Sequence, residues 1–209
     1  MNGKGLIGRK LGMTQVFDTE TKAATPVTIV EVGPCTVTQV RIDAKSGRKV
    51  VQLGFAEQKA QRVTKPLNGH FQKAGTPAFK VVREFDMVGD LATGDQLTVS
   101  MFNEIPVVDV TGTSKGRGFQ GVIKRHNGHR GDKTHGGHCY RIPGSIGNCS
   151  TPSKVWKGVS MPGQMGNVRR TVQNIKVVKC DEERNLLYLK GAIPGSNNGI
   201  IYIREAVKA

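Results

Sequence analysis

Three glycines spaced as Gly116-x-Gly118-x-x-Gly121 are the first feature of this sequence that could do chemistry. They follow a run at Pro106–Val110 that predicts a strand, as in a dinucleotide-binding turn. The continuation does not fit, because no acid lies about twenty positions on to hold a ribose and residues 124–128 make a poor crossover helix. Residues 112–116 also lack the order of a P-loop. The glycines fit RNA contact better, since they let a phosphate backbone approach closely.

A second candidate for chemistry is a group of histidines and cysteines. Four of the five histidines fall at positions 126, 129, 135 and 138, beside Cys139 and ten residues before Cys149. The spacing matches neither paired Cys-x-x-Cys ligands nor a zinc finger, so we expect no metal and no other cofactor. The imidazoles could instead hydrogen-bond phosphates and stack on bases. Stoichiometric zinc that survives dialysis of the purified protein would favour the metal.

No catalytic group stands out near these histidines. Ser145, Ser150 and Ser160 are close in sequence, but none lies in a nucleophile elbow, and Asp132 is the only nearby acid. Trp156 lies between Lys154 and Lys157, where it could stack on a base or anchor the segment to its own protein. We therefore expect a protein that is not an enzyme.

All of these residues lie in one basic, glycine-rich segment, residues 111–170. It holds eleven Lys/Arg and one acid, so it carries +10 of the formal +15 of the chain. It also holds 13 of the 27 glycines and only 14 apolar residues. Such a segment buries too little surface to offset its ordering entropy, so a partner must order it. A phosphate polymer is the obvious candidate.

The flanking residues predict one β-rich body, because short apolar runs alternate with turn residues. We expect strands at 26–32, 36–42, 49–55, 80–85, 96–102, 106–110, 171–180, 186–190 and 200–204. Residues 56–63 and 66–74 fit short helices or irregular turns. Many short strands favour a barrel or a sandwich. We therefore assign residues 1–110 and 171–209 to the body, with a small α+β portion at roughly 56–95, and residues 111–170 to an arm.

Targeting and redox features point to the cytosol. No apolar run approaches the roughly 20 residues of a spanning helix, and the basic N-terminal stretch Met1–Met13 lacks the apolar core of a secretory signal. The four cysteines are widely spaced, which favours reduced thiols.

The glycine pattern belongs to a longer motif that resembles the signature of the L-three family of large-subunit ribosomal proteins. It comprises Phe102, six further residues, Asp109-Val-Thr-Gly-Thr-Ser-Lys-Gly-Arg-Gly-Phe-Gln-Gly121 and then Arg125. The likeness extends over nearly the whole chain, in the compact bacterial form, through segments at 8–14, 62–66, 69–71, 143–147, 163–167 and 189–195.

The resemblance implies a mainly β fold, with a translation-factor-like β-barrel body, a small α+β portion and a long basic extension. It further implies direct binding to large-subunit ribosomal RNA near its 3′ end, early in assembly, with neighbouring ribosomal proteins as further partners. The arm is expected to reach toward the peptidyl-transferase centre, with its tip at Asn148, Cys149 and Ser150. Some relatives have a methylated glutamine at the position of Ser150, so we expect no such modification here.

Within this framework the residues expected to bind ribosomal RNA are basic, imidazole or aromatic side chains of the arm. They are Lys115, Arg117, Lys124, Arg125, His126, Arg130, Lys133, His135, Arg141, Lys154, Trp156, Lys157, Arg169 and Arg170. Two alternatives remain: an RNA-modifying or nucleotide-using enzyme, which turnover or a bound cofactor would favour, and a general DNA-binding protein, which would bind duplex DNA and ribosomal RNA equally.

The charge of the arm predicts a steep salt dependence of RNA binding. If about six to ten phosphates are contacted, affinity for isolated ribosomal RNA falls on the order of 10³- to 10⁵-fold between 50 and 200 mM salt, because bound counterions are released. Filter binding over a salt series, with duplex DNA as competitor, measures this. A flat salt response contradicts the assignment.

Overall fold

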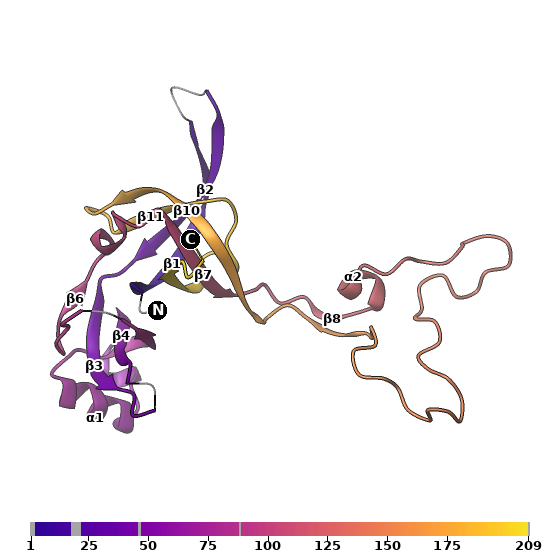
Figure 1. Cartoon of the computed structure of the whole chain (residues 1–209), viewed down its shortest axis with the longest axis horizontal. Coiled ribbons are helices and arrows are strands. Elements are labelled where there is room, and N and C mark those ends of the chain that lie inside the picture. Colours follow the sequence, from indigo (N-terminus) through magenta and orange to yellow (C-terminus); the bar gives the residue numbers. More distant parts are fainter. Residues whose placement is uncertain (1–2, 18–21, 46, 88, 209) are drawn as a thin grey trace. The chain divides into compact units, whose positions relative to one another are not determined.

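A computed structural model describes residues 3–17, 22–45, 47–87 and 89–208 of the chain (Figure 1). Backbone hydrogen bonds join the strands into a closed barrel, a four-stranded sheet and a two-stranded ladder. The mainly β prediction is confirmed. Residues 1–2 of the N-terminal stretch lie outside the described residues.

Six antiparallel strands close the barrel. In order around it they are β1 (Gly5–Phe17), β12 (Ile200–Glu205), β7 (Val107–Thr113), β10 (Arg169–Asp181), β11 (Leu186–Lys190) and β2 (Ala24–Val32), which pairs again with β1. Closure leaves the barrel without an open sheet edge, which removes a site for aggregation.

The barrel core is built from residues two apart on each strand. Val108 and Val110 on β7 are fully buried, as are Ile201 and Ile203 on the neighbouring strand β12 and Leu187 and Leu189 on β11. Side chains two apart point to the same side of a strand, so alternation in the sequence becomes an apolar interior. Each such side chain contributes about 1.5–3 kcal/mol of burial free energy.

The second sheet has the order β5 (Phe79–Asp86), β4 (Lys49–Glu57), β3 (Cys35–Ile42) and β6 (Gln96–Leu97). It is accompanied by the 3₁₀ turn η1 (Ala60–Arg62) and the helix α1 (Lys65–Ala74). The helix ends at Gly75, whose φ of 64° allows its N–H to bond the carbonyl of Gln72 at 3.0 Å. Phe71, the buried residue of α1, packs edge-on against Phe79.

The structure differs from the sequence-based description in three places. The strand expected at 96–102 stops at Leu97, and the 3₁₀ turn η2 (Val99–Phe102) follows, because Val99 and Phe102 are both buried three positions apart. Strand β1 was not expected from the sequence. The α+β portion begins at Cys35 rather than near residue 56, since β3 and β4 pair with each other and with β5.

All four cysteines are free thiols. Burial raises the pKa of the Cys35 thiol to about 12, and its hydrogen bond to the carbonyl of Ile7 lowers that pKa by a smaller amount. No helix in the described part of the chain has the length and apolar character needed to cross a membrane.

Strands β7 and β10 are the barrel strands from which the arm departs and to which it returns. The chain divides into one compact unit of residues 1–114 and 169–209 and a second of residues 115–168. Thr111–Thr113 and Arg169–Arg170 therefore belong to the barrel ladder, where Thr113 pairs with Arg169 and Thr111 with Thr171. The hydroxyls of Thr111 and Thr171 lie 2.8 Å apart and bond across the two strands.

Lys10 is a buried lysine that supports this end of the barrel. It is 7% exposed, and its Nζ donates to the carbonyls of Ile193 at 3.0 Å and Gly195 at 3.3 Å. The same loop contacts β7, because the carbonyl oxygen of Pro194 lies 3.0 Å from the place where a Cβ on Gly112 would be. Lys10 thus fixes a loop that packs against the strand leading to the arm.

Replacing Lys10 with methionine tests this support. Lys10→Met keeps the aliphatic length but leaves the two carbonyls without their charged donor, so we expect the free energy of unfolding to fall by about 1–3 kcal/mol. Urea unfolding measures the change. The matched control is Lys179→Met on β10, an exposed lysine that should change stability by less than about 0.5 kcal/mol. Equal effects of the two substitutions would contradict the role of Lys10.

Candidate nucleic-acid interface

The arm, residues 115–168, has little regular structure. It contains β8 (Gly118–Gln120), which pairs with β9 (Gly163–Met165), and one short helix, α2 (Val122–His126). The rest is turns and irregular chain, drawn in pink and orange in Figure 1. No residue of this unit, all of which the structure describes, is buried. The arm therefore has no hydrophobic core of its own.

The β8–β9 ladder brings the outgoing and returning limbs of the arm together. The N–H of Arg117 donates to the carbonyl of Met165 at 2.8 Å, next to the register pair Gly118 and Met165. Gly166 has a φ of +73°, and a Cβ there would overlap the carbonyl oxygen of Lys115. The two limbs can approach this closely because glycine occupies that position.

Helix α2 adds a second link between the limbs. It ends at Asn127 in the left-handed conformation, and its last turn is basic. The Arg125 Nη1 donates to the carbonyl of Met161 at 2.7 Å, and His126 Nε2, as the protonated ring nitrogen, donates to the same oxygen at 3.2 Å. Gly163 leaves room for the guanidinium, because a Cβ there would lie 2.8 Å from Arg125 Nη1. Arg125 and His126 thus hold the arm together, a role that we did not expect.

The histidine-rich part of the arm forms turns. The N–H of Gly131 donates to the carbonyl of Tyr140 at 3.0 Å, and the N–H of Gly137 to the carbonyl of Thr134 at 3.2 Å. Nowhere in the described chain do three or more His, Cys, Asp or Glu side chains gather as a metal would require. The cysteines at 139 and 149 are exposed free thiols.

The structure exposes every residue expected to contact RNA. All fourteen expected RNA-binding residues are solvent-accessible, and so are the three at the expected tip, Asn148, Cys149 and Ser150. The ion pairs of the described chain all lie in the other unit. The cations of the arm are therefore available to an external anion.

Large apolar side chains are exposed between these cations. Phe119 is 76% exposed, Ile142 62% and Trp156 60%. Lys154 Nζ lies 4.7 Å from the centre of the Trp156 ring, so a cation already covers part of this ring. Exposed rings beside cations can stack on nucleic-acid bases while the cations bind the phosphates.

A closed β-barrel that carries a basic arm without a core is typical of a protein that binds a polyanion such as RNA. The family model described as ribosomal protein L3 matches residues 70–186. The large ribosomal subunit protein uL3 of Thioalkalivibrio sulfidiphilus is 53% identical over 98% of each chain, and that of Vibrio cholerae is 50% identical over 98% of this chain and 99% of the relative. The chain belongs to the ribosomal protein L3 family.

The uL3 protein of Alkaliphilus metalliredigens is a more distant match, 47% identical over 98% of each chain. Together these relatives extend the likeness to both ends of the chain, beyond the residues that the family model matches. A member of this family is a structural component of the ribosome and not an enzyme.

The close approach at Gly166 yields a testable consequence for the free protein. Gly166→Ala should force the two limbs apart, since an alanine at this φ is strained by about 1–3 kcal/mol in addition to the overlap with Lys115. We expect trypsin to cleave after Lys115 and Arg117 about tenfold faster than in the wild-type protein.

Gly144→Ala is the control for that measurement. No heavy atom lies within 4 Å of the Cβ it would add, and its φ is not positive. Equal cleavage rates for the Gly166 variant and the wild-type protein would show that the β8–β9 ladder does not order the base of the arm in solution.

Proposed function

We propose that this chain is a structural constituent of the large ribosomal subunit that binds large-subunit ribosomal RNA directly through its arm. The observation that carries the proposal is the state of the arm: residues 115–168 hold nine Lys/Arg and one acid, form no core and expose all of the expected contact residues. A chain of this kind gains its order from a partner that supplies negative charge.

The basic residues and the glycines of the arm have different roles in RNA binding. Guanidinium groups such as those of Arg117, Arg130 and Arg141 match two phosphate oxygens at once, and Lys124 and Lys133 act as point charges. The glycines between them let the RNA backbone approach the protein backbone. Trp156 and the imidazole of His135 supply flat surfaces for bases.

The barrel anchors both ends of the arm. Since β7 and β10 are neighbours in the barrel, the outgoing and the returning limb of the arm join adjacent strands of the body. The resemblance to the family supports binding near the 3′ end of the RNA, early in assembly, with neighbouring large-subunit proteins as further partners in the cytoplasm.

The tip of the arm, at Asn148, Cys149 and Ser150, lies near the peptidyl-transferase centre in this proposal. Its side chains are an amide, a thiol and a hydroxyl, and the proposal gives none of them a catalytic role. Any effect on peptide transfer therefore acts through the position of the RNA. Ser150 offers no amide nitrogen for methylation.

Removing the arm tests the proposal. The variant replaces residues 115–168 with a two- to four-residue glycine-serine linker between Ser114 and Arg169, which the pairing of Thr113 with Arg169 allows. We expect the barrel of this variant to stay folded, with β-type circular dichroism and cooperative unfolding. When the variant is expressed in cells beside the tagged full-length chain, we expect that it does not co-sediment with large subunits.

Two results of that experiment are informative. Loss of co-sedimentation together with a folded barrel supports the arm as the RNA-binding element. Co-sedimentation of the variant at the level of the full-length chain would assign subunit binding to the body and contradict the proposal.

A further inference from the structure

Two arginines and two aromatic rings form a stack on the body, outside the arm. The Arg83 guanidinium carbon on β5 lies 5.3 Å from the centre of the Tyr202 ring on β12. The Arg204 guanidinium carbon, also on β12, lies 5.2 Å from the centre of the Phe85 ring on β5. The two rings meet edge to face, with their centres 6.5 Å apart. Each strand thus supplies one arginine and one ring.

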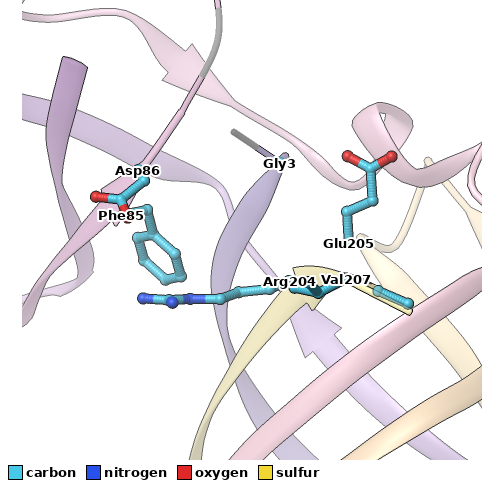
Figure 2. A pocket seen from close by; sticks show the side chains of 7 residues that line it. Gly3, Phe85, Asp86, Arg204, Glu205 and Val207 are labelled. Carbon is cyan, nitrogen blue, oxygen red and sulfur yellow. The ribbon is translucent and has the colours of Figure 1, made fainter. Parts of the chain in front are cut away.

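The stack leaves the hydrogen-bonding edges of the guanidiniums available. A guanidinium is attracted to an aromatic ring through its positive charge, and this attraction does not require its N–H donors to be paired with an acceptor. Figure 2 shows the Arg204 guanidinium beneath the Phe85 ring, pointing away from the Glu205 carboxylate. Both arginines are exposed. The rings therefore hold two forks in place without using their donors.

Nearby acids are largely engaged elsewhere. Glu84 and Asp86 alternate with Arg83 and Phe85 along β5, and they pair with other arginines: Arg41 with Glu84 at 2.8 Å and Arg48 with Asp86 at 3.8 Å. Asp86 and Glu205 line a cavity of about 390 Å³ together with Arg204. Glu205 accepts the backbone N–H of Lys4 at 3.2 Å. Among the described residues, neither Arg83 nor Arg204 forms an ion pair with a carboxylate.

A third arginine adds to the positive charge at this place. Burial lowers the pKa of Arg204, Asp86 opposes that shift, and the positive charges of Arg169 and Arg83 lower the pKa further. Arg169 is the first residue of β10, where the arm returns to the barrel. Three arginines of the body, Arg83, Arg169 and Arg204, therefore add their positive charges at this place.

We propose that Arg83 and Arg204 form a second RNA phosphate site, on the body, in which Phe85 and Tyr202 hold the two guanidiniums for bidentate contact with phosphodiester oxygens. This inference rests on the proposed function and extends it from the arm to the body. RNA is the ligand that the observations favour over an acidic protein segment, because the positive charge of Arg169 acts on the same site, so that three cations gather there. Planar forks also match phosphate oxygens well.

The first test uses the unmodified protein, so folding of a variant does not enter. Phenylglyoxal modification of arginines is measured by mass spectrometry with and without a transcript of the 3′ part of large-subunit ribosomal RNA. We expect the transcript to slow modification of Arg83 and Arg204 at least fivefold and to leave Arg41 and Arg48 unchanged. Unchanged rates at Arg83 and Arg204 would overturn the site. Protection that needs intact subunits, and is absent with RNA alone, would assign the pair to a protein carboxylate instead.

The second test compares two double variants of equal charge. Arg83→Gln/Arg204→Gln removes the proposed forks, and Arg41→Gln/Arg48→Gln removes two arginines of the same unit that form ion pairs with Glu84 and Asp86. We expect the first variant to bind the transcript about ten- to hundredfold more weakly and to lower the slope of log affinity against log salt by about 2. The second should stay close to the wild-type protein.

The controls separate the possible failures. Equal losses of RNA affinity in the two double variants would show that only net charge matters. A loss of thermal stability in Arg83→Gln/Arg204→Gln without a change in salt slope would show that the stack only stabilises the packing of the two sheets. Either result overturns the phosphate site while leaving the proposed function intact. A wild-type protein with a flat salt response would instead contradict the proposed function itself.

Discussion

The pairing of β7 with β10 is the constraint on which the arm depends. Thr113 and Arg169 are Cα partners in this ladder, although the whole arm lies between them in the sequence. Closing a loop of this length costs roughly 3–4 kcal/mol of chain entropy before any constant term. The barrel offsets that cost through its core and through two polar links, the Thr111–Thr171 hydroxyl pair and the bond from the N–H of Asn174 to Asp109 Oδ1 at 2.9 Å. The arm therefore begins from a fixed base without a core of its own.

The two units differ in what orders them. The barrel buries alternating Val, Leu and Ile side chains and is ordered by its own interior. The arm orders only its base, through the β8–β9 ladder and the bonds of Arg125 and His126 to Met161. Fixing a residue costs about 1–2 kcal/mol, and these few links cannot offset that cost over the whole arm. Apart from Arg125, the arm makes little use of its cations to stabilise itself, so most of them stay free for a ligand.

The sequence predicts the parts of the structure that depend on local pattern. Most barrel strands were expected because their apolar residues alternate, as in β11 and β12. Strand β1 was missed because it is rich in glycine and basic residues, yet Gly8 is needed there: a Cβ would lie 2.7 Å from the carbonyl of Glu31. The assignment of β3 and β4 to a separate sheet depends on tertiary pairing, which alternation does not encode. Exposure of the arm followed from its composition, whereas the bond between Arg125 and Met161, 36 residues apart, could not be predicted from spacing.

The partners of the arginines distinguish two uses of the same side chain. Arg41 and Arg48 form ion pairs with Glu84 and Asp86 of β5, and Arg125 is bonded to a carbonyl of its own arm, so these three groups stabilise the protein itself. Arg83 and Arg204 are instead held by ring faces, which fix a guanidinium without consuming its donors. Composition counts all five as equal contributions to a basic protein. Only the contacts show that a cation of the body can be well positioned and yet form no ion pair, which is the state that a ligand phosphate requires.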